Sequence, residues 1–261
     1  MRKQTGVAIG GAGQERRCNL QAIAGVFLSR EDAERAFSTL RASGVSASKT
    51  SLLTPGDVRR QFQESPDGGL STGPTLVAPL LPGVGLVTGA GVLAIAILRA
   101  AGAAIGAVAG GSLEDGAEDL PEEEIFVYED VLRKGRSVVI VLAEDGSAAA
   151  IIRQSFLEQG AEAIDAARQA WWIGLRDAEG DHYSASGRNF ANDEKFYRLG
   201  FEAALHARTR CKEFDQVSAE MASKLEDLEQ QYPGAQIEEA FTRGYQRGRE
   251  HFQALCDERA A

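Results

Sequence analysis

The 261-residue sequence has few of the residues that build metal centres or disulfide frameworks, since it contains three cysteines and three histidines. The cysteines, Cys18, Cys211 and Cys256, are odd in number. Their spacing matches neither a disulfide framework nor a metal knuckle. We therefore expect unpaired thiols in a reducing cytosol, and we predict no metal and no cofactor.

Positive charge is also scarce, because 28 Lys and Arg face 38 Asp and Glu, for a net charge of −10. Binding to nucleic acid needs clustered Lys and Arg against the phosphates, and no basic stripe with interleaved aromatic residues is present. Nucleic acid is therefore not expected as a partner. Residues 1–18 are Gly-rich and polar and lack the apolar stretch of a signal peptide. They predict a disordered lead-in to a cytoplasmic protein.

Catalytic patterns are missing too, since the chain has no Gly-x-Ser-x-Gly elbow. The glutamates at 122–124 are explained by the positive end of a helix dipole. Glu202 and His206 are spaced to share a helix face, but a metal site would need further ligands beside them. His182 and His251 lie elsewhere in the sequence. We predict a protein that is not an enzyme and has no catalytic residues.

What is present begins with a β-α-β pattern. Residues 20–28 form a short apolar run typical of a buried strand. Ser29 then suits the N-cap of a helix that Gly44 would end. Residues 45–53 alternate in the manner of a second strand. A right-handed crossover would place these two strands parallel in one sheet.

The regular pattern resumes at Pro121, which suits the first position of a helix. A strand at 137–142 (SVVIVL), a helix at 147–159 and a weaker strand at 161–167 follow. The order β-α-β, insertion, α-β-α-β predicts an α+β fold. We expect a ferredoxin-like four-stranded sandwich over residues 19–175, with its helices on one face.

Residues 74–113 form an insertion whose single charge is Arg99. Small residues recur at four-residue intervals, which on a helix lets a second backbone approach closely. We therefore expect a glycine-zipper hairpin with helical arms at 83–98 and 100–113. The predicted self-association residues are Gly85, Gly89, Gly102, Gly106 and Gly110.

The sequence of this insertion is compatible with several structures. The hairpin can pack against its own domain or against copies of itself, which is the interpretation we favour. Arms of this length span roughly 24 and 21 Å, short of the ~30 Å hydrocarbon core, so full membrane spanning is disfavoured. Shallow insertion into a membrane is the third interpretation. A phosphate-cradling loop at Gly83, Gly85 and Gly89 has the wrong spacing and follows prolines instead of a strand.

Residues 176–261 predict a small helical bundle with three amphipathic stripes. Two of its helices share a pattern of glycine beside an aromatic residue, and we predict that they cross at those glycines. The helix-packing residues are Tyr197, Gly200, Phe201, Phe241, Gly244, Tyr245 and Gly248. Trp171 and Trp172 precede the bundle. Because adjacent residues of a regular element do not both face one core, we expect one of them at the module junction or at an interface.

Residues 22–168 resemble the bacterial general stress protein 17M-like family, also described as heat-induced stress proteins. The resemblance is carried by GVFLSREDAERAFSTLRASG at the front and by LPGVGLVTGAGVLAIAI and AIGAVAGG in the insertion. LPEEEIFVYEDVLRKG and VVIVLAED follow in the second half. It implies a ferredoxin-like fold split by a glycine-zipper segment, and an association with stress. It supplies no established catalytic residues, and the C-terminal extension departs from the family pattern.

These features predict a non-enzymatic, stress-associated bacterial protein that forms a homo-oligomer through its hairpin and its helical module. One alternative is a membrane-associated stress protein anchored by the hairpin. Another is a small-ligand binder or enzyme that uses a cleft between the two modules, with His182 or His206 involved.

Overall fold

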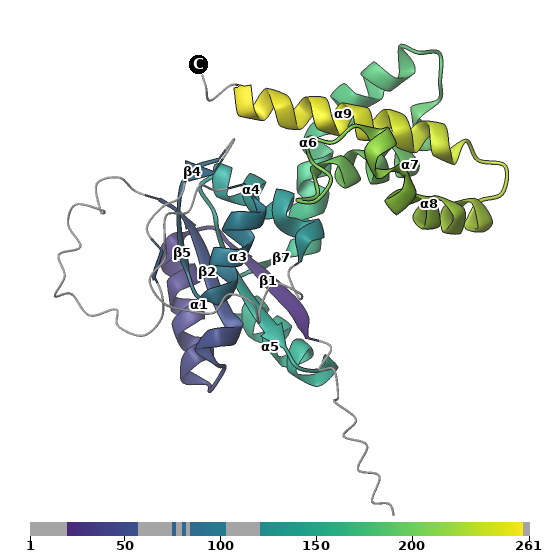
Figure 1. Cartoon of the computed structure of the whole chain (residues 1–261). Coiled ribbons are helices and arrows are strands. Elements are labelled where there is room, and N and C mark those ends of the chain that lie inside the picture. Colours follow the sequence, from purple (N-terminus) through teal and green to yellow (C-terminus); the bar gives the residue numbers. More distant parts are fainter. Residues whose placement is uncertain (1–19, 57–74, 77–79, 82–83, 103–120, 258–261) are drawn as a thin grey trace, which may run out of the picture.

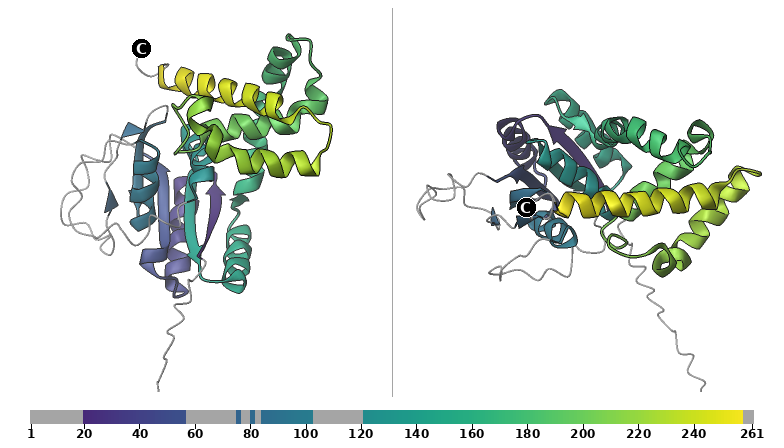
Figure 2. Two further views of the ribbon diagram at one scale, coloured as in Figure 1. Left: turned by 45° about the vertical axis from the view of Figure 1, so that its right-hand side comes forward. Right: turned by 90° about the horizontal axis from the view of Figure 1, so that it is seen from above.

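The computed structural model describes residues 20–56, 75–76, 80–81, 84–102 and 121–257 (Figure 1). The fold is α+β, with an antiparallel sheet and a group of helices at one end of it (Figure 2). The strands are β1 (Gln21–Phe27), β2 (Thr50–Pro55), β3 (Thr75–Leu76), β4 (Leu80–Leu81), β5 (Gly85–Ala90), β6 (Ser137–Ala143) and β7 (Glu162–Ala163). Their order is β3-β5-β2-β6-β1-β7, and β4 pairs with β5.

Strand β6 lies between β1 and β2, and every one of its residues is buried. Its β-branched run suits a central strand, which confirms the strand predicted at 137–142. Both β1 and β2 pair with β6 in antiparallel fashion. They are therefore parallel to each other, as the β-α-β pattern predicts.

Helices cover both faces of the sheet, so the prediction that they lie on one face is wrong. Helices α1 (Arg30–Ala42) and α5 (Gly146–Glu158) pack on one face around Phe27 and Phe156. Helices α3 (Val92–Ala100), α4 (Ile125–Arg133) and α6 (Ile164–Ser184) contribute to the core on the other face. A short 3-10 helix, η3 (Glu122–Glu124), leads into α4. The apolar residues of α3 in the insertion, of α4 and of α6 create this second layer.

The insertion differs from the predicted helical hairpin. Residues 85–90 form β5, which pairs with β2 over Leu52 to Pro55, so a helical arm over 83–98 is wrong. Gly91 separates this strand from α3 with a φ of +97°. A Cβ at Gly91 would lie 2.9 Å from the Cα of Ser51, so a larger residue does not fit. Gly102, with a φ of +84°, follows the end of α3.

The predicted self-association glycines that the structure describes therefore do not line one helix face. Gly85 and Gly89 lie on β5, and Gly102 lies beyond α3. Gly106 and Gly110 are outside the described residues. Apolar residues of β5 and α3 are buried against the protein's own sheet and α4. These buried residues are Val87, Leu93, Ala94, Ile97 and Leu98.

The C-terminal half is helical, with α6, α7 (Phe190–Leu205), α8 (Phe214–Gln231) and α9 (Ile237–Asp257) (Figure 1). The strand predicted at 161–167 shortens to β7, because α6 begins at Ile164. Helix α6 continues across position 175, where the sequence predicts the end of the sheet domain. One hydrophobic core runs from the sheet through α4 and α6 to α7 and α9.

Candidate functional site

The two tryptophans stand in the middle of α6, where the sheet domain meets the helical module. Trp171 is 5% exposed and its ring centroid lies 4.8 Å from that of Phe126 in α4. Trp172 is 1% exposed and packs against Tyr197 and Phe201 of α7. Both side chains belong to one core, so the expectation that adjacent tryptophans cannot share a core is wrong. Helix α6 packs against α4 and α7 at this point, so its two adjacent tryptophan side chains are both buried.

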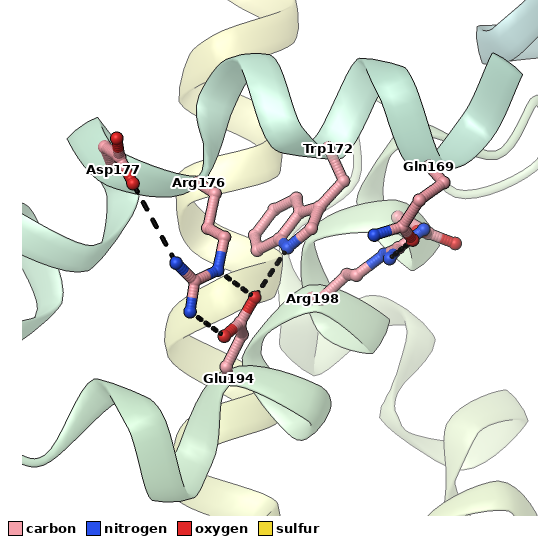
Figure 3. Close-up of polar contacts among 7 residues, drawn as sticks. Gln169, Trp172, Arg176, Asp177, Glu194 and Arg198 are labelled. Atoms are coloured by element: carbon pink, nitrogen blue, oxygen red, sulfur yellow. Dashed lines mark hydrogen bonds and ion pairs between the residues drawn. The ribbon is translucent and has the colours of Figure 1, made fainter. Parts of the chain in front are cut away.

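Trp172 also takes part in a polar clasp between α6 and α7 (Figure 3). Its indole N–H donates to Glu194 Oε1 over 3.0 Å. Arg176 donates to both oxygens of Glu194, over 2.7 and 2.8 Å. The Arg176 hydrogen bonds hold the pKa of Glu194 below its usual range, against the effect of burial. On the other side of the indole, the guanidinium of Arg198 lies 5.6 Å from the Trp172 ring centroid.

A second clasp joins α6, α7 and α9 at the buried carboxylate of Glu179. Tyr197 donates its hydroxyl to Glu179 Oε2 over 2.7 Å. Arg247 donates from Nε and Nη2, over 3.1 and 2.9 Å, to the two oxygens. Burial raises the pKa of Glu179, but the hydrogen bonds from Arg247 and Tyr197 outweigh burial and leave that pKa lowered. The carboxylate of Glu179 is therefore charged, and both of its oxygens accept hydrogen bonds.

The glycines of α7 and α9 lie where these two helices cross. A Cβ at Gly200 would lie 2.7 Å from the carbonyl carbon of Phe241. A Cβ at Gly244 would lie 2.8 Å from the carbonyl carbon of Tyr197. Gly248 is similarly close to the backbone of Phe201. The two backbones thus approach to a distance that only glycine allows.

The aromatic partners in the shared pattern surround this crossing. Tyr197, Phe201, Phe241 and Tyr245 are all fully buried. Tyr245 donates to the carbonyl oxygens of Thr209 and Lys212, over 3.0 and 3.2 Å. All seven predicted helix-packing residues thus come together inside one chain, and the contact that they form is intramolecular.

A buried ion pair joins α4 to the segment after α7. Arg210 Nη1 donates to Glu129 over 2.8 Å, and both side chains are less than one-tenth exposed. Burial raises the pKa of Glu129, and the charge of Arg210 opposes this effect. Arg210 also donates to the carbonyl oxygen of Leu205 over 2.9 Å. The pair ties the sheet domain to the helical module, and no sequence signal links two residues 81 positions apart.

The candidate histidines lie in different surroundings. His206 stacks on Phe126, with ring centroids 6.4 Å apart, and burial lowers its pKa to about 4. His182 is exposed on α6. Glu202 accepts a hydrogen bond from Arg198 over 2.6 Å and lies 3.8 Å from Arg168, so its carboxylate is already paired. Within the part of the chain that the structure describes, no three His, Cys, Asp or Glu side chains form a group suited to a metal ion.

Comparisons with protein-family models, with curated proteins and with solved structures found no match. Across the described ranges, every helix is too short or too polar to span the hydrocarbon core of a bilayer.

Proposed function

We propose that this chain is a non-enzymatic, stress-associated protein that works by assembling with copies of itself. The resemblance of residues 22–168 to the general stress protein 17M-like family motivates the association with stress. The strand order β2-β6-β1-β7, with antiparallel neighbours, supports a ferredoxin-like sandwich. We place the site of assembly elsewhere than at the predicted glycine zipper, because Gly85 and Gly89 lie on β5, within the protein's own sheet.

One observation carries the assembly proposal: the outer edge of the sheet at β1 is only partly paired. Strand β7 pairs with β1 at Gly25 and Val26 alone. Over residues 21–24, no strand in the described part of the chain pairs with this outer edge. An open edge presents backbone donors and acceptors that a second strand can pair with. A two-fold axis would pair β1 with its own copy in antiparallel fashion.

Helix α5 supports this choice because it packs beside the same edge and carries apolar residues outward. It contacts both β1 and β7. Ile151 and Leu157 of α5 are 68% and 60% exposed. Gln154 lies between them on the outward surface of the helix. Two copies joined at β1 would bring their α5 helices toward each other and cover these side chains.

Light scattering coupled to size-exclusion chromatography tests the proposal over a range of protein concentrations. We expect the wild-type chain to elute as a dimer or larger particle. The double variant Ile151→Glu and Leu157→Glu should elute as a folded monomer. Gln154→Glu is the matched control, because it adds a negative charge to the same surface without removing an apolar side chain, and it should retain the wild-type mass. A monomeric wild type at every concentration would refute self-assembly.

A further inference from the structure

The segment between α7 and α8, residues 206–213, runs along one face of α9. Tyr245 of α9 donates its hydroxyl to the carbonyl oxygens of Thr209 and Lys212, over 3.0 and 3.2 Å. The ring of Phe214, next along the chain, lies 5.5 Å from that of Tyr245 between centroids. These contacts fix the segment against the middle of α9.

Two more contacts continue along the same face toward the C-terminus. Glu213 forms an ion pair with Arg249. The guanidinium of Arg210 lies 4.8 Å from the ring centroid of Phe252. Cys256 lies four residues after Phe252, and therefore about one turn further along the same face.

Cys211 immediately follows Arg210 in this segment and is exposed. Its φ is +67°, the one positive value among the described non-glycine residues. A left-handed conformation is uncommon for a residue with a side chain. Backbone hydrogen bonds hold the turn, since the N–H groups of Thr209 and Arg210 donate to the carbonyl oxygen of His206.

The two thiols also share an electrostatic environment. Cys256 is partly buried, near the end of α9. Burial raises the pKa of its thiol, and the negative charge of a Cys211 thiolate raises that pKa further. The contacts of Arg210 with Phe252 and of Glu213 with Arg249 place Cys211 and Cys256 on neighbouring stretches of the segment 206–213 and of α9.

We propose that Cys211 and Cys256 are an oxidation-sensitive thiol pair, which a peroxide converts to an intramolecular disulfide. The Cys211 thiolate attacks one peroxide oxygen, forming an S–O bond while the O–O bond breaks and hydroxide leaves. The Cys256 thiolate then attacks the Cys211 sulfur, forming the S–S bond and releasing a second hydroxide. The two thiols lose two electrons in total, and with their protons the peroxide becomes two waters.

The position of Cys256 favours closure of this bond. A disulfide needs Cα atoms roughly 4.4–6.8 Å apart, so the two elements must fit each other closely. Cys256 is one residue from the end of α9 at Asp257, and a terminal helical turn adjusts more readily than a central one. The bond would fasten the residue beside Arg210, which makes the buried ion pair with Glu129. Oxidation would thereby reinforce the contact between the sheet domain and the helical module.

The experiment uses the full chain with Cys18→Ser, which leaves these two thiols alone in the sequence. The reduced protein is treated with hydrogen peroxide at two concentrations tenfold apart, unfolded, and titrated for free thiols. Trypsin digestion without reductant then isolates the dipeptide of Cys211 and Lys212 linked to the peptide of residues 250–259. We expect both thiols to be lost at a rate independent of protein concentration, with this linked peptide as the product.

Three results would overturn the thiol pair: two surviving thiols, disulfide-linked dimers whose yield rises with concentration, or a sulfenic acid at Cys211 beside a free Cys256. The single variants Cys211→Ser and Cys256→Ser, in the same background, are the controls and must yield no linked peptide. Circular dichroism before oxidation shows that each variant is folded. The outcome is independent of self-assembly, because the bond forms within one chain.

Discussion

Gly244 and Gly248 are four residues apart in α9, and Gly85 and Gly89 are four residues apart in β5. In α9 this interval places both glycines on one face, against the backbone of α7. In β5 the same interval also puts both residues on one face, but the face is that of a sheet. A Cβ at Gly89 would meet side chains, at 3.1 Å from Ala94 and Leu98, and not a second helix backbone.

The neighbours of the glycines explain the difference. Around Gly244 and Gly248 stand arginines, glutamates and glutamine, which favour helices and leave one apolar stripe. Residues 85–90 contain valine and threonine, whose branched side chains favour strands, and follow two prolines. The spacing of small residues therefore identifies a shared face only after the type of element is known.

The largest expected effect is at the helix crossing. Gly244→Ala places a Cβ against the backbone of Tyr197, which cannot move aside without separating α7 from α9. We expect a loss of about 4 kcal/mol or more in the free energy of unfolding, measured by urea denaturation. Gly174→Ala in α6 is the control. Its Cβ meets nothing within 4 Å, and it should stabilise the protein by about 0.5–1 kcal/mol. Equal effects at both positions would mean that the backbones do not touch.

The next test asks whether the sheet domain and the helical module stabilise each other. Glu129→Gln leaves the buried guanidinium of Arg210 without its counter-charge, which we expect to cost about 3 kcal/mol of unfolding free energy. Glu122→Gln is the matched control, because it breaks the pair with Arg208, a side chain that is 77% exposed. That change should cost less than about 1 kcal/mol. Two separate unfolding transitions in Glu129→Gln would show that this pair couples the regions.

A pH titration probes the same junction. The pKa of His206 is lowered to about 4 in the folded protein. Below pH 6.5 the His206 side chain is therefore protonated in the unfolded chain but still neutral in the folded one. The contribution of His206 to the free energy of unfolding is therefore complete above pH 6.5 and is lost as the pH falls from 6.5 toward 4. We expect His206 to account for a loss of about 2 kcal/mol between neutral pH and about pH 5. His206→Gln should remove that part of the pH dependence, whereas His182→Gln, at an exposed position, should keep it.

The smallest effect is expected in β5. Gly89→Ala brings a Cβ to 3.1 Å from Leu98 Cδ1, the end of a flexible side chain, and to 3.1 Å from Ala94 Cβ, which moves only with the backbone of α3. We expect a cost of about 1 kcal/mol, measured by the same denaturation. A cost as large as that of Gly244→Ala would abolish the distinction between the two regions. Retention of the wild-type circular dichroism spectrum would show that β5 persists.

Local patterns predict the elements that local chemistry controls. Helix α1 begins after Ser29, whose hydroxyl accepts a hydrogen bond from the Asp32 N–H over 3.1 Å. Strand β6 needs only its run of β-branched residues. The sequence is less informative at 161–167, where the alternation suits a strand but Ile164 already starts a helix. Burial of Trp171 and Trp172 further along α6 stabilises the helix at this point. That burial cannot be predicted from the residues at 161–167 alone.

The polar contacts of the site join residues that lie far apart in the sequence. The residues that flank Glu129 and Arg210 in the sequence give no sign of an ion pair. The buried pair forms only because α4 packs against the segment after α7. The same holds for Glu179, whose partners Tyr197 and Arg247 come from two other helices. A helical wheel marks these residues as polar but does not select their partners.

By itself the sequence determines an α+β chain with a helical C-terminal half, because hydrophobic period, caps and β-branched runs act over a few residues. It also identifies the glycines of α7 and α9 as unusual, since glycine inside a helix costs stability unless something approaches it closely. Tertiary structure decides which backbone approaches, makes residues 85–90 a strand beside β2, and buries both tryptophans. These outcomes depend on contacts between distant residues, whose energies no local pattern contains.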